Sequence, residues 1–194
     1  MIKRMESLQD IYKNYASHDC TMGSDKGTTH SYLEVYTQLF EPLQTTQINI
    51  LEIGIFSGAW VEVMHKYFSH SYIVGMDINT SSLVFSKGLD RVKIIECDAT
   101  KKESVTLVEN TMFDIIIDDG SHLENDILTT FDLFLPLLKK EGMFIIEDID
   151  IGKYSFILDK LQSKCDVNGL ELTVHNLCHK KGRFDDVIAV IRYK

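Results

Sequence analysis

The stretch Ile115-Ile116-Ile117-Asp118-Asp119-Gly120-Ser121-His122 passes directly from an apolar segment into acid. A second apolar segment, residues 143–146, runs into Glu147-Asp148. Because a buried strand does not tolerate charge, each acidic run marks the carboxyl end of a buried strand, where open α/β sheets bind ligands. A third apolar run, residues 48–53, carries Glu52 and opens into the turn Gly54-Ile55-Phe56-Ser57-Gly58. Together these runs predict a cofactor pocket with an acidic site beside it.

Strand-like and helix-like segments alternate along most of the chain. The strand-like runs are residues 48–55, 72–78, 92–97, 113–118 and 143–147, and the helix-like segments are 59–68, 81–87, 101–110, 124–139 and 153–164. This alternation predicts an α/β fold with a doubly wound, mostly parallel sheet. Two final strand-like runs, 170–177 and 186–192, leave no room for a helix between them and predict a C-terminal antiparallel hairpin.

The chain length predicts one domain spanning residues 1–194, too short to include an independent substrate domain. Within it, residues 1–46 are expected to form a helical arm and residues 47–194 the core. The arm should contain helices at 7–17 and 31–40, separated by a loop at 22–30. Since Gly23 and Gly27 flank Lys26, and His30 follows, this loop is expected to act as a mobile lid; an ordinary solvated loop is the alternative.

Composition limits the classes of partner and compartment. The net charge of −9, with dispersed Lys and Arg, argues against a nucleic-acid substrate. No apolar run approaches the roughly 20 residues of a membrane span, and the N-terminus lacks the apolar core of a signal peptide. The four cysteines lack CxxC spacing, which favours reduced thiols over disulfides or zinc. A soluble, cytoplasmic protein is therefore expected.

The turn after the first strand is suited to a nucleoside without phosphates. Gly54 and Gly58 permit a tight turn and a close ligand, while Ile55 and Phe56 leave less room for the pyrophosphate of NAD. Asp77 follows the next strand, 23 residues after Gly54, where an acid can accept both ribose hydroxyls. Asp98 follows the third strand. A strand-end Asp is often only a turn or helix cap, but the order of these residues on three successive strands favours a cofactor site.

The second acidic region suits a metal and a base. Asp119, Glu147 and Asp148 offer hard oxygen ligands of the kind that Mg²⁺ prefers. A cation holding a hydroxyl would stabilise the developing alkoxide, and His122 can accept the proton. Alternatively, the acids are merely solvated, Asp119-Gly120 forms a turn and Ser121 caps a helix that begins at His122. Asp118, closer to the strand, is expected to contact the cofactor.

Residues 46–194 resemble the class I S-adenosylmethionine-dependent methyltransferases. The closer likeness is to the magnesium-dependent sugar O-methyltransferases of macrolide biosynthesis and the related cephalosporin-hydroxylase-like family. It rests on Gly23-Ser24-Asp25-Lys26-Gly27 with His30 and Tyr32, on Asp118-Asp119-Gly120-Ser121-His122, and on Ile146-Glu147-Asp148. The macrolide enzymes carry a large additional N-terminal domain that helps to hold the acceptor and has no counterpart in these 194 residues, so acceptor identity does not carry over.

The resemblance implies a Rossmann-like sheet of seven strands with the last strand antiparallel. It implies S-adenosylmethionine as cofactor, Mg²⁺ held by Asp119, Glu147 and Asp148, and an adenine contact from Asp98. The expected cofactor-binding residues are Lys26, Glu52, Gly54, Ser57, Gly58, Asp77, Asp98 and Asp118.

The sequence thus predicts an O-methyltransferase that acts on a hydroxyl of a sugar or glycosylated metabolite, with Asp119 and His122 as catalytic residues. One alternative is a metal-independent methyltransferase that acts on nitrogen or a phosphate-derived group. Another is a non-catalytic cofactor-binding accessory protein. A hydroxylase is disfavoured, because a single nearby His does not supply a two-His, one-carboxylate iron site. Whether the chain forms a homo-oligomer stays open.

Overall fold

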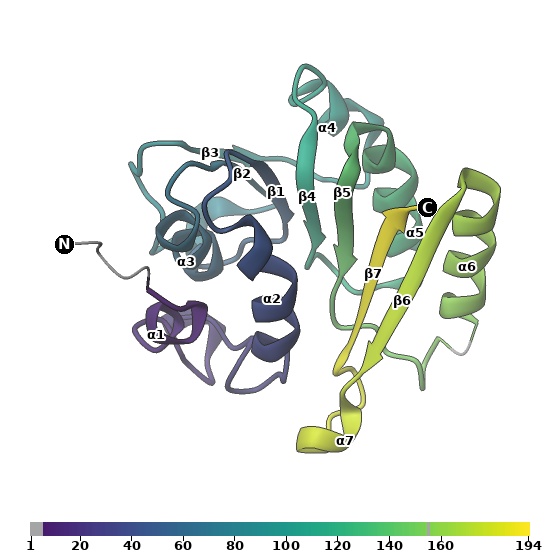
Figure 1. The fold of residues 1–194 in the computed structure, drawn as a ribbon, viewed down its shortest axis with the longest axis horizontal. Coiled ribbons are helices and arrows are strands. Elements are labelled where there is room, and N and C mark those ends of the chain that lie inside the picture. The colour runs from purple at the N-terminus through teal and green to yellow at the C-terminus, as the bar shows by residue number, and fades with distance from the viewer. Residues whose placement is uncertain (1–5, 155) are drawn as a thin grey trace.

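The computed structural model describes residues 6–154 and 156–194, which build one sheet of seven strands in the order β3-β2-β1-β4-β5-β7-β6 (Figure 1). The strands are β1 (Asn49–Ile53), β2 (Tyr72–Asp77), β3 (Val92–Glu96), β4 (Phe113–Asp118), β5 (Leu138–Ile146), β6 (Leu170–Asn176) and β7 (Val187–Tyr193). Strands β1 to β5 pair in parallel, whereas β7 runs antiparallel to both β5 and β6. The predicted doubly wound sheet with its antiparallel C-terminal hairpin is confirmed.

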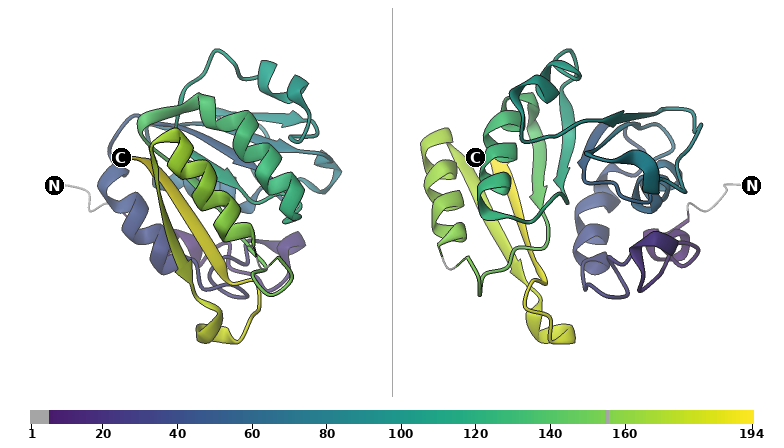
Figure 2. Two further views of the ribbon diagram at one scale, coloured as in Figure 1. Left: turned by 90° about the vertical axis from the view of Figure 1, so that its right-hand side faces the viewer. Right: turned by 180° about the vertical axis from the view of Figure 1, so that it is seen from behind.

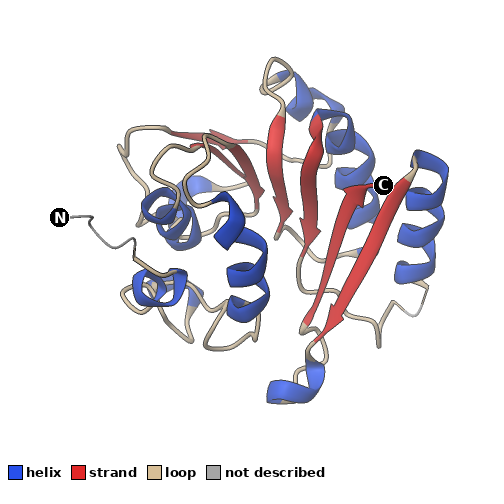
Figure 3. Cartoon of the chain, in the orientation of Figure 1, coloured by secondary structure: helices blue, strands red, loops and turns tan. Residues whose placement is uncertain are grey.

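Helices cover both faces of this sheet (Figures 2 and 3). One face carries α1 (Leu8–Tyr12), α2 (Leu33–Phe40) and α3 (Ala59–Tyr67), and the other carries α4 (Lys102–Thr106), α5 (Glu124–Phe134) and α6 (Ile157–Asn168). Single turns of 3-10 helix are η1 (Cys20–Met22), η2 (Glu41–Leu43), η3 (Thr80–Ser82) and η4 (Leu135–Leu137). Among the described residues, no helix is both long and apolar enough to cross a bilayer.

The central strands are buried because helices cover both of their faces. In β4, Ile115 and Ile117 enter the apolar cluster under α1 to α3, while Ile116 enters the cluster under α4 to α6. This alternation of two buried faces explains why the strand reads as a continuous apolar run. The acids at its end lie outside the apolar clusters, at the carboxyl edge of the sheet.

Several element boundaries differ from those predicted. The helix expected at 124–139 ends at Phe134, because Pro136 lies in η4 and cannot continue a helix, and β5 begins at Leu138 rather than at residue 143. In place of the helix expected at 81–87 there is only η3. A single turn, α7 (Cys178–Lys181), lies between β6 and β7, where the sequence left no room for a helix. The turn fits because it has only four residues and ends at Gly182, which adopts the left-handed conformation.

The N-terminal segment packs against the carboxyl edge of the sheet. Its loop is pinned by Tyr12, whose hydroxyl donates to the carbonyl of Ser24 (2.7 Å) and accepts from the amide of Gly27 (2.8 Å). Lys181 of α7 donates to the carbonyl oxygens of Gly27 and Thr28 at 2.9 and 2.7 Å. These hydrogen bonds hold the loop in place in this conformation, and its mobility as a lid stays a prediction.

Candidate functional site

The turn after β1 lies against the chain that leaves β4. Gly54 has φ +83°, and a Cβ at this position would lie 1.9 Å from the carbonyl oxygen of Asp119. The two strand ends are joined there, because the amide of Asp119 donates to the carbonyl of Ile53 (2.8 Å). Glycine is thus required both by the backbone conformation and by the close approach. This is the point where the strand order reverses, the usual ligand crevice of an open α/β sheet.

The rest of the turn forms the start of α3. Gly58, at φ +80°, is the N-cap residue of that helix. Ser57 is buried, and its carbonyl accepts from the amides of Val84 and Phe85 at 3.0 and 2.9 Å. Gly54 and Gly58, which the sequence predicted to form a tight turn, therefore do form the turn between β1 and α3.

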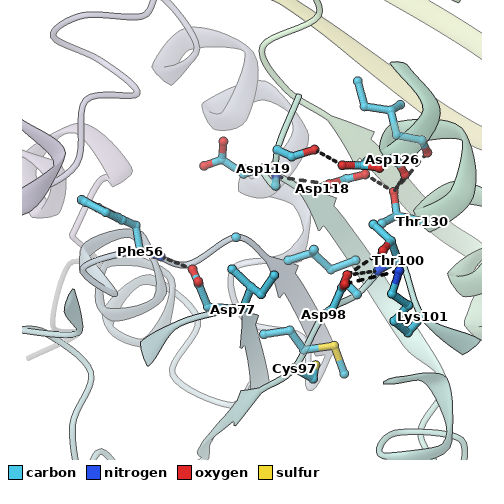
Figure 4. A pocket seen from close by; sticks show the side chains of 18 residues that line it. Phe56, Asp77, Cys97, Asp98, Thr100, Lys101, Asp118, Asp119, Asp126 and Thr130 are labelled. Carbon is cyan, nitrogen blue, oxygen red and sulfur yellow. Dashed lines mark hydrogen bonds and ion pairs between the residues drawn. The ribbon is translucent and has the colours of Figure 1, made fainter. Parts of the chain in front are cut away.

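A cavity of about 530 Å³ opens beside this turn (Figure 4). Its lining includes Gly54, Asp77, Asp98 and Asp118, four of the predicted cofactor residues. Asp77 accepts from the backbone amides of Phe56 (2.8 Å) and Asn79 (2.9 Å). Asp98 likewise accepts from the amide of Thr100 (2.9 Å). Each Asp therefore caps a local turn, as the alternative interpretation proposed, and also borders the cavity.

Asp118 is the most buried acid of this cavity. Its carboxylate accepts from the hydroxyl of Thr130 and from the amide of Gly120 (3.2 Å). Burial raises the pKa of Asp118 to about 6, although both hydrogen bonds lower it. These donors hold the side chain at the wall of the cavity.

A second cavity of about 280 Å³ adjoins the first and shares Gly54, Phe56, Asp119 and Gly120 with it. Its lining includes Lys26, Glu52, Ser57, Trp60, His122 and Asp148. Seven of the eight predicted cofactor residues thus line these two adjoining cavities, and Gly58 lines neither. The acidic motif after β4 lies where the cavities meet.

Lys26 links the two acidic motifs. Its Nζ lies 2.5 Å from Oδ2 of Asp119 and 2.7 and 2.8 Å from the two carboxylate oxygens of Glu147. Burial would lower the pKa of Lys26, but the negative charges of Asp119, Glu147 and Glu52 raise it well above its ordinary value. Lys26 therefore stays protonated. Glu147 also accepts from the hydroxyl of Tyr36, so the N-terminal segment supplies both of its partners.

Asp148 is held by residues that the sequence did not single out for this role. The hydroxyl of Tyr32 donates to Oδ1 of Asp148 (2.5 Å), and Nδ1 of His30 lies 3.3 Å from the same oxygen. The His30 ring stacks on Tyr32 with centroids 4.8 Å apart, and its Nδ1 lies 3.5 Å from the fully buried Asp186. The sequence signal for this role was the motif shared with the sugar methyltransferases, because that motif includes both His30 and Tyr32.

Asp119, His122 and Asp148 form a cluster whose ligand atoms lie within 4.8 Å of one another. Nε2 of His122 is 3.8 Å from Oδ1 of Asp119 and 3.8 Å from Oδ2 of Asp148. His122 and Asp148 have φ values of +57° and +53°, which non-glycine residues rarely adopt. The backbone is therefore strained where it turns these side chains toward the cluster. The carboxylate of the predicted ligand Glu147 faces Lys26 and Tyr36 instead.

Two residues that line the second cavity each carry a buried polar atom with no hydrogen-bond partner among the described residues. These atoms are Oε2 of Glu52 and Nε1 of Trp60. Burial raises the pKa of Glu52 to about 8, against the lowering effect of Lys26. Folding raises this pKa from 4.5, so the folded state is favoured when Glu52 is protonated. This contribution to the free energy of unfolding is complete below pH 4.5 and is lost as the pH rises through about 8.

We therefore expect Glu52→Gln to stabilise the fold in alkaline solution, because the amide removes a buried charge. The free energy of unfolding in urea should exceed that of the parent by about 1 to 3 kcal/mol at pH 8.5, with a smaller difference at pH 5. The exposed Glu141→Gln serves as the control. An equal effect of Glu52→Gln at both pH values would contradict this assignment.

Curated relatives match about two thirds of this chain. The 8-demethyl-8-alpha-L-rhamnosyl tetracenomycin-C 2'-O-methyltransferase of Streptomyces olivaceus is 29% identical over 136 residues, which are 66% of this chain and 35% of that protein. The L-olivosyl-oleandolide 3-O-methyltransferase of Streptomyces antibioticus is 32% identical over 133 residues, 64% and 34% of the two chains. The chain thus spans about a third of the length of these relatives. The ribosomal RNA large subunit methyltransferase E of Brachyspira hyodysenteriae is 26% identical over 159 residues, 75% and 77% of the two chains.

Solved structures share the fold. The MycE methyltransferase from the mycinamycin biosynthetic pathway, in complex with Mg and SAH, matches with a TM-score of 0.76 at 21% identity, over 97% of this chain and 55% of that one. The model of the FtsJ-like methyltransferases matches residues 33–181. The predicted relationship to methyltransferases is confirmed: this chain belongs to the FtsJ-like methyltransferase family.

Proposed function

We propose that this chain transfers a methyl group from S-adenosylmethionine to a hydroxyl of a sugar or glycosylated metabolite. The observation that carries the proposal is the meeting of two cavities at Gly54 and Asp119, with Asp148 and His122 beside the junction. One cavity suits the cofactor, the other suits the acceptor and the cofactor's reactive end. Family membership supports the reaction type, and the sugar O-methyltransferases among the relatives support the acceptor class.

The residues of the larger cavity fit S-adenosylmethionine. Gly54 lets the turn after β1 lie against the chain that leaves β4, and the cavity of about 530 Å³ beside this turn suits a nucleoside without phosphates. Asp77 would hold the ribose and Asp98 the adenine, while Lys26, Glu52 and Ser57 border the region proposed for the amino-acid end. When bound, the cofactor supplies an electrophilic methyl group on a sulfonium. The chain's task is then to align an acceptor oxygen with that methyl group.

The acidic cluster fits a divalent cation. Asp119 and Asp148 point oxygen ligands at a common position, and the predicted third ligand, Glu147, lies next to Asp119 across Lys26. When bound, Mg²⁺ would favour the deprotonated form of a coordinated hydroxyl. Since Mg²⁺ prefers oxygen ligands, Nε2 of His122 is left to accept the acceptor's proton. Tyr32 and His30 hold Asp148 in place for this role.

RNA is the second candidate acceptor, favoured by the ribosomal RNA methyltransferase among the relatives. The net charge of −9 and the carboxylates around the site oppose a phosphate backbone. A small acceptor is therefore preferred. Methyl transfer to rRNA, with none to rhamnosylated or olivosylated polyketides, would reverse this preference.

Asp77→Ala should weaken binding of S-adenosylhomocysteine by about 1.5 to 3 kcal/mol, because charge-assisted hydrogen bonds to the ribose are lost. Isothermal titration calorimetry measures this change. Asp90→Ala, an exposed acid outside both cavities, is the control. Since Asp77 also caps the turn at Phe56, thermal unfolding of each variant should be recorded. Unchanged affinity in folded Asp77→Ala would remove Asp77 from the site.

Removal of divalent cations with EDTA should abolish methyl transfer and spare binding of S-adenosylhomocysteine, with activity restored by added Mg²⁺. Asp148→Asn should weaken Mg²⁺ binding at least about tenfold, because a charged ligand becomes neutral. The exposed Asp132→Asn on α5 should bind Mg²⁺ like the parent. Full turnover in excess EDTA would eliminate the cation and favour the metal-independent alternative.

His122→Ala should lower kcat by about 10² to 10⁴, the usual contribution of a positioned base, with little change in the affinities for cofactor and Mg²⁺. The exposed His70→Ala should keep the parental rate. A pH–rate profile of both variants completes the test. If His122→Ala keeps both the rate and its pH dependence, another group is the base; if it loses Mg²⁺ affinity, His122 is a ligand.

A further inference from the structure

Lys26 places a positive charge between two of the proposed metal ligands. Its side chain is only 4% exposed, and its ammonium contacts Asp119 and both oxygens of Glu147 within 2.8 Å. The Glu147 side chain is 1% exposed and also accepts from Tyr36. In this conformation, the buried carboxylate of Glu147 is already paired with Lys26 and Tyr36 of its own chain.

The ammonium and a divalent cation cannot both use these oxygens. Mg²⁺ requires oxygen ligands at about 2.0 to 2.1 Å in a nearly octahedral arrangement. With Nζ of Lys26 at 2.5 to 2.8 Å from the same atoms, the two cations would overlap or repel strongly in a buried site. Coordination by Glu147 therefore requires Lys26 to leave.

The neighbouring cavity offers Lys26 another position. Lys26 and Glu52 line the same cavity of about 280 Å³, and Oε2 of Glu52 has no hydrogen-bond partner among the described residues. Trp60, whose ring centroid lies 5.7 Å from Nζ of Lys26, borders the same space. A displaced ammonium would thus find a second buried carboxylate within its own cavity.

We infer that Lys26 is an internal cation with two positions: it occupies the Asp119–Glu147 pair until a divalent cation takes that place, and then pairs with Glu52. This inference deepens the proposed function, because it rests on a divalent cation binding at Asp119 and Glu147. The competing arrangement leaves Lys26 in place and puts the cation on the open side, between Oδ1 of Asp119 and Oδ2 of Asp148.

Competition predicts that Lys26 weakens cation binding. We expect Lys26→Met to bind Mn²⁺ at least about tenfold more tightly than the parent by isothermal titration calorimetry, because no ammonium must be displaced. Lys139→Met removes a lysine that pairs with Asp114 (2.8 Å) at the other end of β4, and should bind Mn²⁺ like the parent. Mn²⁺ affinity in Lys26→Met that equals or falls below the parental value overturns the inference.

Stability provides a second readout, since Lys26→Met leaves buried carboxylates uncompensated. Without Mn²⁺ the variant should melt well below the parent, and Mn²⁺ at about 100 times its Kd should raise its Tm by about 5 to 10 °C. At the same concentration, the increase should be smaller in the parent. If Mn²⁺ raises the Tm of Lys26→Met by no more than it raises the Tm of the parent, Lys26 does not compete with the cation.

The second position is tested by Glu52→Gln. In the parent, Glu52→Gln should weaken Mn²⁺ binding, because the displaced ammonium loses its carboxylate; in the Lys26→Met background it should have little effect. An equal loss in both backgrounds overturns the two-position arrangement.

A crystal structure with Mn²⁺ decides between the two cation sites. The inference expects the anomalous peak of Mn²⁺ against Glu147, with Lys26 turned toward Glu52. A peak between Asp119 and Asp148, with Lys26 still on Glu147, overturns it and leaves the proposed function intact. Absence of Mn²⁺ binding to the parent and to Lys26→Met removes the cation from the proposed function and the inference with it.

Discussion

The ion pair of Lys26 with Asp119 and Glu147 is the interaction on which the site depends. Pairing of β4 with β5 brings Asp118 opposite Ile146, so the acids that follow the two strands must lie side by side. Two carboxylates at a buried sheet edge repel each other and lose their hydration, and leaving such charge uncompensated typically costs about 3 to 5 kcal/mol. Lys26 supplies the opposite charge from a segment more than 90 residues away in sequence, and so fixes the N-terminal loop over the strand ends.

Much of this arrangement could be predicted from the sequence, because its causes are local. The apolar run at 115–117 ends in acid, and Gly54 and Gly58 punctuate the turn after β1, so strand ends and ligand crevice follow from pattern alone. The partners of those acids could not be predicted in the same way. Tyr32 meets Asp148 across 116 residues, and only the folded chain shows that its hydroxyl points there. Likewise, β5 begins with Leu138-Lys139-Lys140-Glu141, whose charges hide the strand from a hydrophobicity pattern.

The backbone conformation at the site could not be predicted from the sequence either. A positive φ is expected at glycine, and Gly54 and Gly58 meet that expectation. Phe56, His122 and Asp148 adopt it too. His and Asp adopt a positive φ more often than most other residues, whereas Phe does not. All three border the second cavity, which indicates that contacts around the site hold the chain in a costly conformation. Such strain arises in the assembled fold, and local propensity alone does not predict it at these positions.

The charge balance of the site fits the proposed chemistry. Carboxylates attract the sulfonium of the proposed cofactor, but they also raise the pKa of any nearby hydroxyl and so oppose formation of the alkoxide. A positive charge near the acceptor must offset this effect if a hydroxyl is to react. The ammonium of Lys26 is already paired with Asp119 and Glu147. The cluster of Asp119, His122 and Asp148 borders the same cavity. A divalent cation at the carboxylates would provide that charge, and His122 would take the proton at the same edge. The acidity that repels a nucleic-acid backbone is thus compatible with a small neutral acceptor, provided that cation and base act together.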